Sequence, residues 1–332
     1  MKIALIGRSE LLFNTALALQ EEGHDIRVMI TSKAWPEYQV TEEDFKKLSE
    51  RIGCDYFYAA NVNDKKFIED AKKRQIDIGI SVNHPTVITQ AYLDAYQFGI
   101  LNAHAGDLPR FRGNACPNWA ILMGEPSMAL TIYRMEGNQL DLGDILAQEK
   151  FLLGPHTYIG DVYTWLKEAA PRLFLQTLGH ISKNPSYVLK KKSDLGSDGF
   201  RCYPRIPSDS EINWSGSAED IHRLIRASSE PFSGAYTFYQ DKKLFVWRAE
   251  LLNDGEKYLA VPGQIAQRDK QTGDVIVITG KGKLKLTEVS WVGEERTHPV
   301  DFITSFRIRL GKGSGSERFV KEWDTKSRIA AS

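Results

Sequence analysis

Blocks of apolar residues alternate with amphipathic stretches over the first half of the chain. Residues Lys2–Ile6 form a short apolar run that ends at Gly7, and Leu12, Ala16 and Leu19 then recur at helical spacing. Similar patterns predict further strands at 26–30, 56–59, 76–82, 99–104, 129–135 and 145–153, and helices at 42–51, 65–73, 114–123 and 158–178. Alternating strands and helices predict an α/β fold with a doubly wound, mostly parallel sheet over residues 1–190.

The pattern changes in the last third of the chain. A polar, glycine-bearing stretch predicts a linker over 191–205. Ser217 followed by Asp220 is typical of a helix start, and short strand-like runs follow at 235–239, 244–252, 263–267, 274–279 and 283–289. These runs predict a small, OB-like β-barrel domain over 206–310, followed by a tail at 311–332.

Charge and cysteine usage narrow the function classes. The 332 residues carry 43 basic and 43 acidic side chains, so no global field attracts a polyanion, and a nucleic-acid partner is disfavoured. Three scattered cysteines argue against a disulfide framework and against a Cys-x-x-Cys metal site, and we expect no metal. The chain has neither a signal-peptide core nor a membrane-length apolar run, so we expect a cytoplasmic protein without a membrane partner.

Polar residues interrupt the end of one strand that should be buried. Asn102 and His104 are two residues apart and therefore face the same side of an extended chain. They stand at the carboxyl end of the strand, where open α/β sheets form their ligand crevice. The alternative is that both are hydrogen-bonded polar groups that only close a strand. Asp141 follows some 40 residues later, in a loop where its carboxylate could reach the same crevice.

Taken together, these residues resemble the folate-dependent formyltransferase family. Its pattern is Asn-x-His, then Leu-Pro-x-x-Arg-Gly, then Leu-Asp-x-Gly-Asp, and the chain has Asn102 and His104, then Leu108 to Gly113, then Leu140 to Asp144 in that order. The resemblance covers the whole N-terminal unit, which it identifies as Rossmann-like, and extends more loosely to the C-terminal domain. The family includes methionyl-tRNA formyltransferases, sugar N-formyltransferases and the hydrolase domain of formyltetrahydrofolate dehydrogenase.

The resemblance implies that Asn102, His104 and Asp141 catalyse formyl transfer from N10-formyltetrahydrofolate to a primary amine. Asn102 would donate to the oxyanion, His104 would donate to it or relay the proton of the amine, and Asp141 would hold the imidazole. The proton path stays open, and Asp107 is a competing carboxylate in the turn before Pro109. The folate pocket of the family matches Val82, Asn83, His84 and Pro85, with Leu140 and Asp141.

Four features bear on the acceptor amine. Asn118 and Trp119, after Arg112 and Gly113, resemble the sugar N-formyltransferases and the hydrolase domain of formyltetrahydrofolate dehydrogenase more than the transfer-RNA enzymes, and the alternative for Trp119 is a core residue. The first turn, Arg8 and Ser9, could hold a phosphate at a helix N-terminus. Exposed aromatics in the loop after the second strand, Trp35 and Tyr38, could stack a nucleotide base. Lys190, Lys191 and Lys192 form the one basic run that could favour RNA, and their alternative reading is a solvated linker.

The favoured function is therefore formylation of a dTDP- or UDP-linked amino deoxysugar destined for a surface polysaccharide such as the O-antigen of lipopolysaccharide. Expected substrate-binding residues are Arg8, Ser9, Trp35, Arg112, Asn118 and Trp119, and a homodimer is possible. Methionyl-tRNA formylation is the alternative. Hydrolysis of formyltetrahydrofolate, or nucleotide-sugar binding without catalysis, ranks after it.

Overall fold

The computed structural model describes residues 1–192 and 199–312, which form two compact units. The first unit contains residues 1–120, 125–155 and 160–204, and the second contains 121–124, 156–159 and the chain from Arg205 onward. Residues 193–198 of the expected linker, and the expected tail beyond Lys312, lie outside the described residues. Within the described ranges no helix is long and apolar enough to cross a bilayer.

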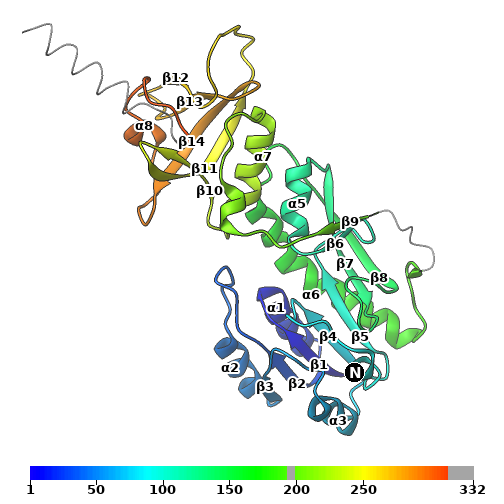
Figure 1. Cartoon of the computed structure of the whole chain (residues 1–332). Coiled ribbons are helices and arrows are strands. Elements are labelled where there is room, and N and C mark those ends of the chain that lie inside the picture. The colour runs from blue at the N-terminus through cyan, green and yellow to red at the C-terminus, as the bar shows by residue number, and fades with distance from the viewer. Residues whose placement is uncertain (193–198, 313–332) are drawn as a thin grey trace, which may run out of the picture. The chain divides into compact units, whose positions relative to one another are not determined.

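A seven-stranded sheet forms the centre of the first unit (Figure 1), in the order β3-β2-β1-β4-β5-β7-β8. Its strands are β1 (Lys2–Gly7), β2 (Asp25–Thr31), β3 (Asp55–Tyr58), β4 (Ile78–Val82), β5 (Ile100–His104), β7 (Ser127–Arg134) and β8 (Ile145–Leu152). Strands β1 to β5 are parallel, whereas β7 and β8 are antiparallel to their neighbours. The order reverses between β1 and β4, so the carboxyl ends of these strands border the crevice used for ligands in this architecture.

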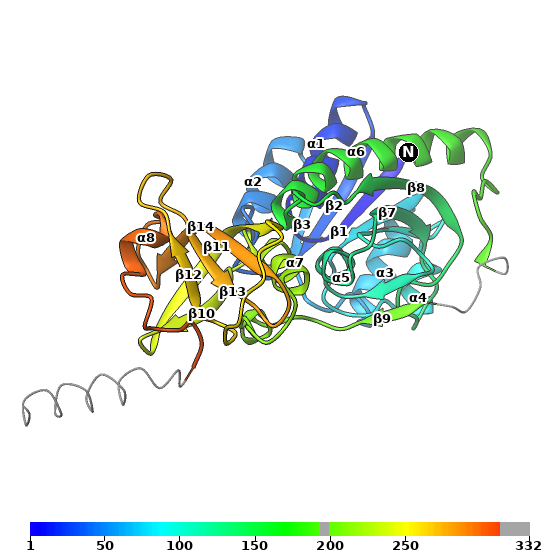
Figure 2. The same cartoon turned by 90° about the horizontal axis from the view of Figure 1, so that it is seen from above.

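Helices cover both faces of this sheet. They are α1 (Glu10–Glu21), α2 (Glu42–Ile52), α3 (Lys65–Arg74), α4 (Gln90–Leu93), α5 (Cys116–Met123) and α6 (Ile159–Lys183). One apolar cluster, which includes the buried Tyr92, joins β1 and β2 to α3 and α4. Figure 2 shows α1, α2 and α6 on the opposite face. The expected doubly wound, mostly parallel sheet is thereby confirmed, with element ends shifted by a few residues.

The second unit is built on a five-stranded antiparallel sheet in the order β10-β11-β14-β13-β12. The strands are β10 (Ala235–Tyr239), β11 (Lys242–Leu252), β12 (Ile265–Arg268), β13 (Val275–Ile278) and β14 (Lys283–Trp291), accompanied by η2 (Pro207–Ser210), α7 (Ala218–Ser228) and α8 (Pro299–Phe302). The Ser217 hydroxyl accepts the backbone N–H of Asp220 at 3.1 Å, which satisfies an otherwise unpaired donor at the start of α7. Ile221 and Ile225 then pack into the core of the sheet.

A two-stranded parallel sheet was not expected from the sequence. It pairs β6 (Phe111–Gly113) with β9 (Phe200–Cys202), and Gly113 lies opposite Cys202. Strand β9 falls inside the segment expected to be a linker and belongs to the first unit. Three-residue strands are too short to show a periodic pattern, which is why the sequence does not reveal them.

Candidate active site

Asn102 and His104 lie in the carboxyl-terminal half of β5 and line a cavity of about 360 Å³ in the first unit. This volume falls in the lower part of the range usual for small-molecule sites, roughly 300–1,000 Å³. The other lining residues come from the loop after β4, the turn from β6 into α5, strand β7 with its following loop, and α6. They are Ser81, Asn83, His84, Pro85, Thr86, Val87, Ala103, Ala105, Gly113, Asn114, Ala115, Cys116, Pro117, Tyr133, Met135, Gln139, Leu140, Asp141 and Tyr163.

Asp141 reaches this cavity from the loop between β7 and β8. Its backbone has a φ of 51°, in the left-handed region that Asp and Asn tolerate better than most residues. Its Oδ2 accepts the Gly113 N–H at 2.7 Å, and its Oδ1 lies 3.4 Å from His104 Nδ1. The structure therefore brings Asn102, His104 and Asp141 together, and β6 supplies a backbone donor that holds the carboxylate.

The ring of His104 has oxygen partners on both sides. Its Nε2 lies 2.8 Å from the Phe111 carbonyl oxygen, and because a carbonyl only accepts, Nε2 carries the hydrogen in this contact. The other ring nitrogen, Nδ1, faces the Asp141 carboxylate. Each ring nitrogen of His104 therefore lies next to an oxygen that accepts hydrogen bonds.

Tyr133 is a member of the site that sequence reasoning missed. Its Oη donates to Asp141 Oδ1 at 3.2 Å and accepts from Asn102 Nδ2 at 3.4 Å. Burial, and after it the charge of Asp141, raises the pKa of Tyr133 well above its ordinary value. Only the antiparallel pairing of β5 with β7 places Tyr133 opposite Asn102, and the sequence pattern does not reveal that pairing.

Asp107, the competing carboxylate, does not line the cavity. Its Oδ2 lies 3.6 Å from Lys150 Nζ instead. The two carboxylates thus have different surroundings, and Asp141 is the one that faces His104.

Most residues expected to bind the folate line the cavity, namely Asn83, His84, Pro85, Leu140 and Asp141. Val82 differs, because it is fully buried in β4 and does not line the cavity, and its carbonyl oxygen accepts the backbone N–H of Arg8 at 3.0 Å. Both ring nitrogens of His84 are buried and have no hydrogen-bond partner. Burial, and after it the charge of Arg8, lowers the pKa of His84 to about 4, so the ring is neutral near pH 7.

The residues expected near the acceptor phosphate lie beside the cavity and do not line it. Arg8 Nε donates to the Asn83 carbonyl oxygen at 3.1 Å and Nη1 donates to the Lys33 carbonyl oxygen at 2.5 Å. The guanidinium lies 5.2 Å from the ring centroid of Trp35 and 6.0 Å from that of Tyr38. Ser9 Oγ accepts from Asn83 Nδ2 at 3.1 Å, which connects this cluster to the loop after β4.

One expectation about this cluster was wrong. Trp35 is 53% exposed, as predicted, but Tyr38 is only partly exposed. Burial raises the pKa of Tyr38 to about 12, and the hydroxyl is therefore protonated over the physiological range. Trp35 is the aromatic residue of this loop that offers a free face.

The remaining residues expected to bind the acceptor substrate lie on β6 and α5, on either side of the turn that joins them, and none of them lines the cavity. Arg112 lies on β6 and is partly exposed, while Asn118 is buried within α5. Trp119 Nε1 donates to the Tyr203 carbonyl oxygen at 2.9 Å, and its ring packs on the cluster of Phe111, Cys116 and Cys202. Trp119 therefore ties the segment around β9 to α5.

Comparison with known proteins identifies the family that this site belongs to. The family model described as "Formyl transferase" matches residues 1–178, and "Formyl transferase, C-terminal domain" matches 206–307. The chain belongs to the folate-dependent formyl transferase family. It is an enzyme of that family, and its one-carbon donor is a formyl folate.

Relatives of this formyl transferase carry different names. A methionyl-tRNA formyltransferase of Agathobacter rectalis is 26% identical, covering 94% of this chain and 98% of the relative. The bifunctional polymyxin resistance protein ArnA of Wigglesworthia glossinidia brevipalpis is 30% identical over 66% of this chain and 33% of its own length.

Solved structures share the fold of the formyl transferase at low sequence identity. WlaRD, a sugar 3N-formyl transferase solved with dTDP and 5-N-formyl-THF, has a TM-score of 0.65 at 16% identity, covering 89% of this chain and 99% of its own. HypX of Aquifex aeolicus with tetrahydrofolic acid has a TM-score of 0.59 at 18% identity, covering 94% of this chain and 47% of its own.

The cysteines of the formyl transferase do not supply a nucleophile. Cys116 Sγ lies 3.7 Å from His104 Nε2, and both Cys116 and Cys202 are buried. Burial raises the pKa of both thiols, which keeps them in the unreactive protonated form. The described residues contain no group of three or more His, Cys, Asp or Glu side chains that could hold a metal ion.

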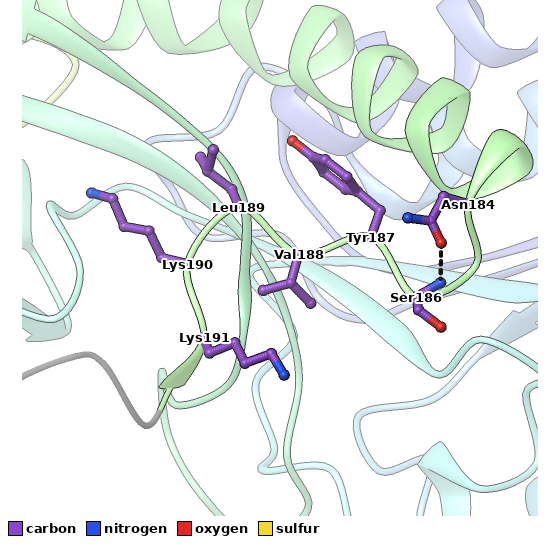
Figure 3. Close-up of a pocket in the computed structure, with 7 residues that line it drawn as sticks. All are labelled: Asn184, Ser186, Tyr187, Val188, Leu189, Lys190 and Lys191. Carbon is purple, nitrogen blue, oxygen red and sulfur yellow. Dashed lines mark hydrogen bonds between the residues drawn. The ribbon is translucent and has the colours of Figure 1, made fainter.

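A second hollow of about 450 Å³ follows α6 and contains none of the expected catalytic residues. Figure 3 shows the amines of Lys190 and Lys191 pointing in different directions, while Ser186 donates its backbone N–H to Asn184 Oδ1 at 3.1 Å. Lys190 Nζ donates to Gln148 Oε1 at 3.3 Å, and Lys192 pairs with Glu136. The basic run therefore does not form one convergent anion site.

Proposed function

We propose that this formyl transferase moves the formyl group of N10-formyltetrahydrofolate to the amino group of a dTDP- or UDP-linked amino deoxysugar. The observation that carries the proposal is the cluster of Arg8 and Trp35 beside the catalytic cavity. Trp35 offers a half-exposed aromatic face to a base, and Arg8 is a cation at the carboxyl end of β1, next to the crevice. A small anionic, aromatic ligand fits that combination.

Formyl transfer requires stabilisation of negative charge on the formyl oxygen. When the amine attacks the formyl carbon, the carbonyl oxygen becomes an oxyanion in a tetrahedral intermediate. Asn102 Nδ2 has two hydrogens, and only one of them is directed to Tyr133. The other N–H supports an oxyanion donor role for Asn102, and removing such a donor typically slows a reaction by about 10²–10³-fold.

His104 and Asp141 support the proton transfers. The Nδ1 contact with Asp141 is long at 3.4 Å, so this N–H can turn to a second acceptor in the cavity. His104 then donates this hydrogen to the oxyanion or passes it to the departing folate nitrogen, and the vacated Nδ1 takes up the proton lost by the amine, while the Asp141 carboxylate holds the ring in place. His84, neutral and without a protein partner, supports binding of the pterin by hydrogen bonds that involve no charge.

The charges near the cavity support a small acceptor over a polyanion. Arg110 pairs with Glu125 at 2.6 Å, and Lys150 lies 3.6 Å from Asp107. Cations that already have protein partners contribute little to binding several phosphates, which is the main source of affinity for nucleic acids.

Methionyl-tRNA formylation is the second candidate, and a row of aromatic rings on the second unit favours it. The rings of Phe238, Tyr236, Phe245 and Trp247 follow one another in that order across β10 and β11 with centroid spacings of 5.8–6.3 Å, and Tyr236 is buried while the other three are partly exposed. Lys243 Nζ lies 3.7 Å from the Tyr236 centroid and Arg296 Cζ 3.9 Å from that of Trp247. Stacking surfaces flanked by cations are typical of single-stranded nucleic-acid sites.

Competing acceptors distinguish the two candidates. Purified protein with N10-formyltetrahydrofolate should formylate dTDP- or UDP-linked amino sugars, with little dependence on salt. Arg8→Ala should raise the KM for the nucleotide sugar, and Arg27→Ala, which removes a cation paired with Asp25 on β2, should not.

Preference for Met-tRNA, with a rate that falls steeply with salt and falls again in Lys243→Ala, would replace the sugar proposal by the second candidate. Release of formate without any amine acceptor would instead indicate a hydrolase. Binding of both ligands without turnover would indicate a non-catalytic protein.

A further inference from the structure

Tyr133 connects Asn102 with Asp141, and the donor and the acceptor of each of its two hydrogen bonds can be assigned. A carboxylate only accepts, so the hydroxyl hydrogen of Tyr133 points to Asp141 Oδ1, 3.2 Å away. The Tyr133 oxygen is then left with its lone pairs for Asn102. Only the nitrogen end of the Asn102 amide can serve that oxygen, across 3.4 Å.

We propose that Tyr133 is a positioning residue that sets the orientation of the Asn102 amide, so that its free N–H faces the reacting formyl oxygen. Without the hydroxyl, the amide could rotate by half a turn and place its oxygen toward the developing negative charge. An amide carbonyl at that position repels an oxyanion, whereas the N–H stabilises it. The inference rests on the proposed role of Asn102 and concerns formyl transfer to any acceptor.

Three further observations make this orientation stable. Tyr133 is only 2% exposed, so water does not compete for its hydroxyl. Its raised pKa keeps the hydroxyl protonated and therefore a permanent donor to Asp141. Asp141 is itself held by the Gly113 N–H at 2.7 Å, and the acceptor of the tyrosine hydrogen is thus fixed from a different element.

The test compares Tyr133→Phe with a matched control. Tyr96 is also a buried tyrosine, and its Oη donates to the Tyr92 hydroxyl at 2.7 Å, away from the cavity, so Tyr96→Phe removes a buried hydrogen bond without touching the site. Turnover is measured with the dTDP-amino sugar, with Met-tRNA, or with water as acceptor, whichever the wild type uses. Binding is measured with folinic acid.

We expect Tyr133→Phe to lower kcat by about 10–100-fold while the Kd for folinic acid changes by less than about threefold, and Tyr96→Phe to leave both values near wild type. Combined with Asn102→Ala, Tyr133→Phe should have almost no further effect on kcat, because it acts through Asn102. A purely structural role would not give this non-additivity. Tyr133→Met serves as a second hydroxyl-free variant should the phenylalanine variant not fold.

A kcat for Tyr133→Phe within twofold of wild type, or effects of Tyr133→Phe and Asn102→Ala that multiply in the double variant, would overturn the inference. Full activity in Asn102→Ala would contradict the proposed oxyanion role, whereas a slow Asn102→Ala with a normal Tyr133→Phe would contradict only the role of the tyrosine.

Discussion

His104 lies between two oxygen acceptors, the Phe111 carbonyl and the Asp141 carboxylate, and no other side chain offers two donors in this planar geometry together with a titratable proton. An asparagine in its place can keep one of the contacts but can neither accept nor release a proton. The histidine is therefore needed for the chemistry more than for the fold.

Replacement of His104 by Asn should lower kcat by about 10²–10⁴-fold, since a positioned acid–base group contributes about that much. The midpoint of thermal unfolding, followed by circular dichroism, should fall by only a few degrees. Near-normal turnover in this variant would remove His104 from the mechanism.

His84 predicts a pH dependence of stability. Its pKa is about 4 in the folded chain and near 6.5 when unfolded, so between these values the unfolded state binds the extra proton. The free energy of unfolding should therefore fall as the pH is lowered from about 6.5 to 4, with a slope of roughly 1 kcal/mol per pH unit from this residue.

Urea unfolding at several pH values measures this effect. His84→Gln should flatten the slope over that window, and His156→Gln, at an exposed position, serves as the control. Equal slopes for wild type and His84→Gln would show that His84 is not buried in its neutral form.

The residues of the proposed catalytic trio could be picked out from the sequence because their motifs are local. Asn102 and His104 are neighbours on one strand, and Asp141 sits in a short characteristic loop. Tyr133 could not, because its role depends on the antiparallel register that places it opposite Asn102. The contacts of Arg8 with backbone carbonyls were equally invisible, since a carbonyl belongs to every residue type.

Strand β6 contacts both the Asp141 carboxylate and strand β9, which lies almost 90 residues after β6 in the sequence. Gly113 donates its N–H to Asp141 and lies opposite Cys202 of β9. A Cβ atom at Gly113, whose φ is 102°, would come within 2.2 Å of the Cys202 carbonyl oxygen. The glycine is required there by the close approach of the second strand.

Gly113→Ala should thus separate β6 from β9, move the N–H away from Asp141, and lower both the unfolding midpoint and kcat. Gly53→Ala is the matched control, because Gly53 also has a positive φ, 80°, but open space around it, and its cost should be only about 1 kcal/mol. A Gly113→Ala variant no worse than Gly53→Ala would show that the β6–β9 sheet does not support the site.

The regular elements could be read from the sequence where their apolar pattern was long enough. Strands β1 to β5 and helices α1 to α3 carry that pattern, whereas β6 and β9 have only three residues each. The apolar pattern of the sequence also does not reveal that β7 and β8 are antiparallel to their neighbours, because a buried strand shows the same apolar run in either direction.

The main boundary between the two units follows β9 in the sequence, and this boundary determines where the chain can be truncated. The first unit extends to Pro204 and includes β9, although the sequence pattern had suggested an end near Lys190. Buried Cys202 and the backbone pairs of β9 belong to the core around Phe111.

A chain ending at Pro204 should therefore bind folinic acid and unfold cooperatively, while a chain ending at Lys190 should unfold at lower temperature and bind it more weakly. Calorimetry of both truncated chains measures this difference. Indistinguishable melting curves would contradict the assignment of β9 to the first unit.

The left-handed backbone of Asp141 also bears on how this family can change over evolution. Asn and Gly are the residues that accept such a conformation with little strain, and the codons of both differ from those of Asp by a single base. One mutation can thus remove the carboxylate while the loop and its surroundings keep their shape. On the role proposed for Asp141, such a single-base change would slow formyl transfer while the other residues that line the cavity stay in place.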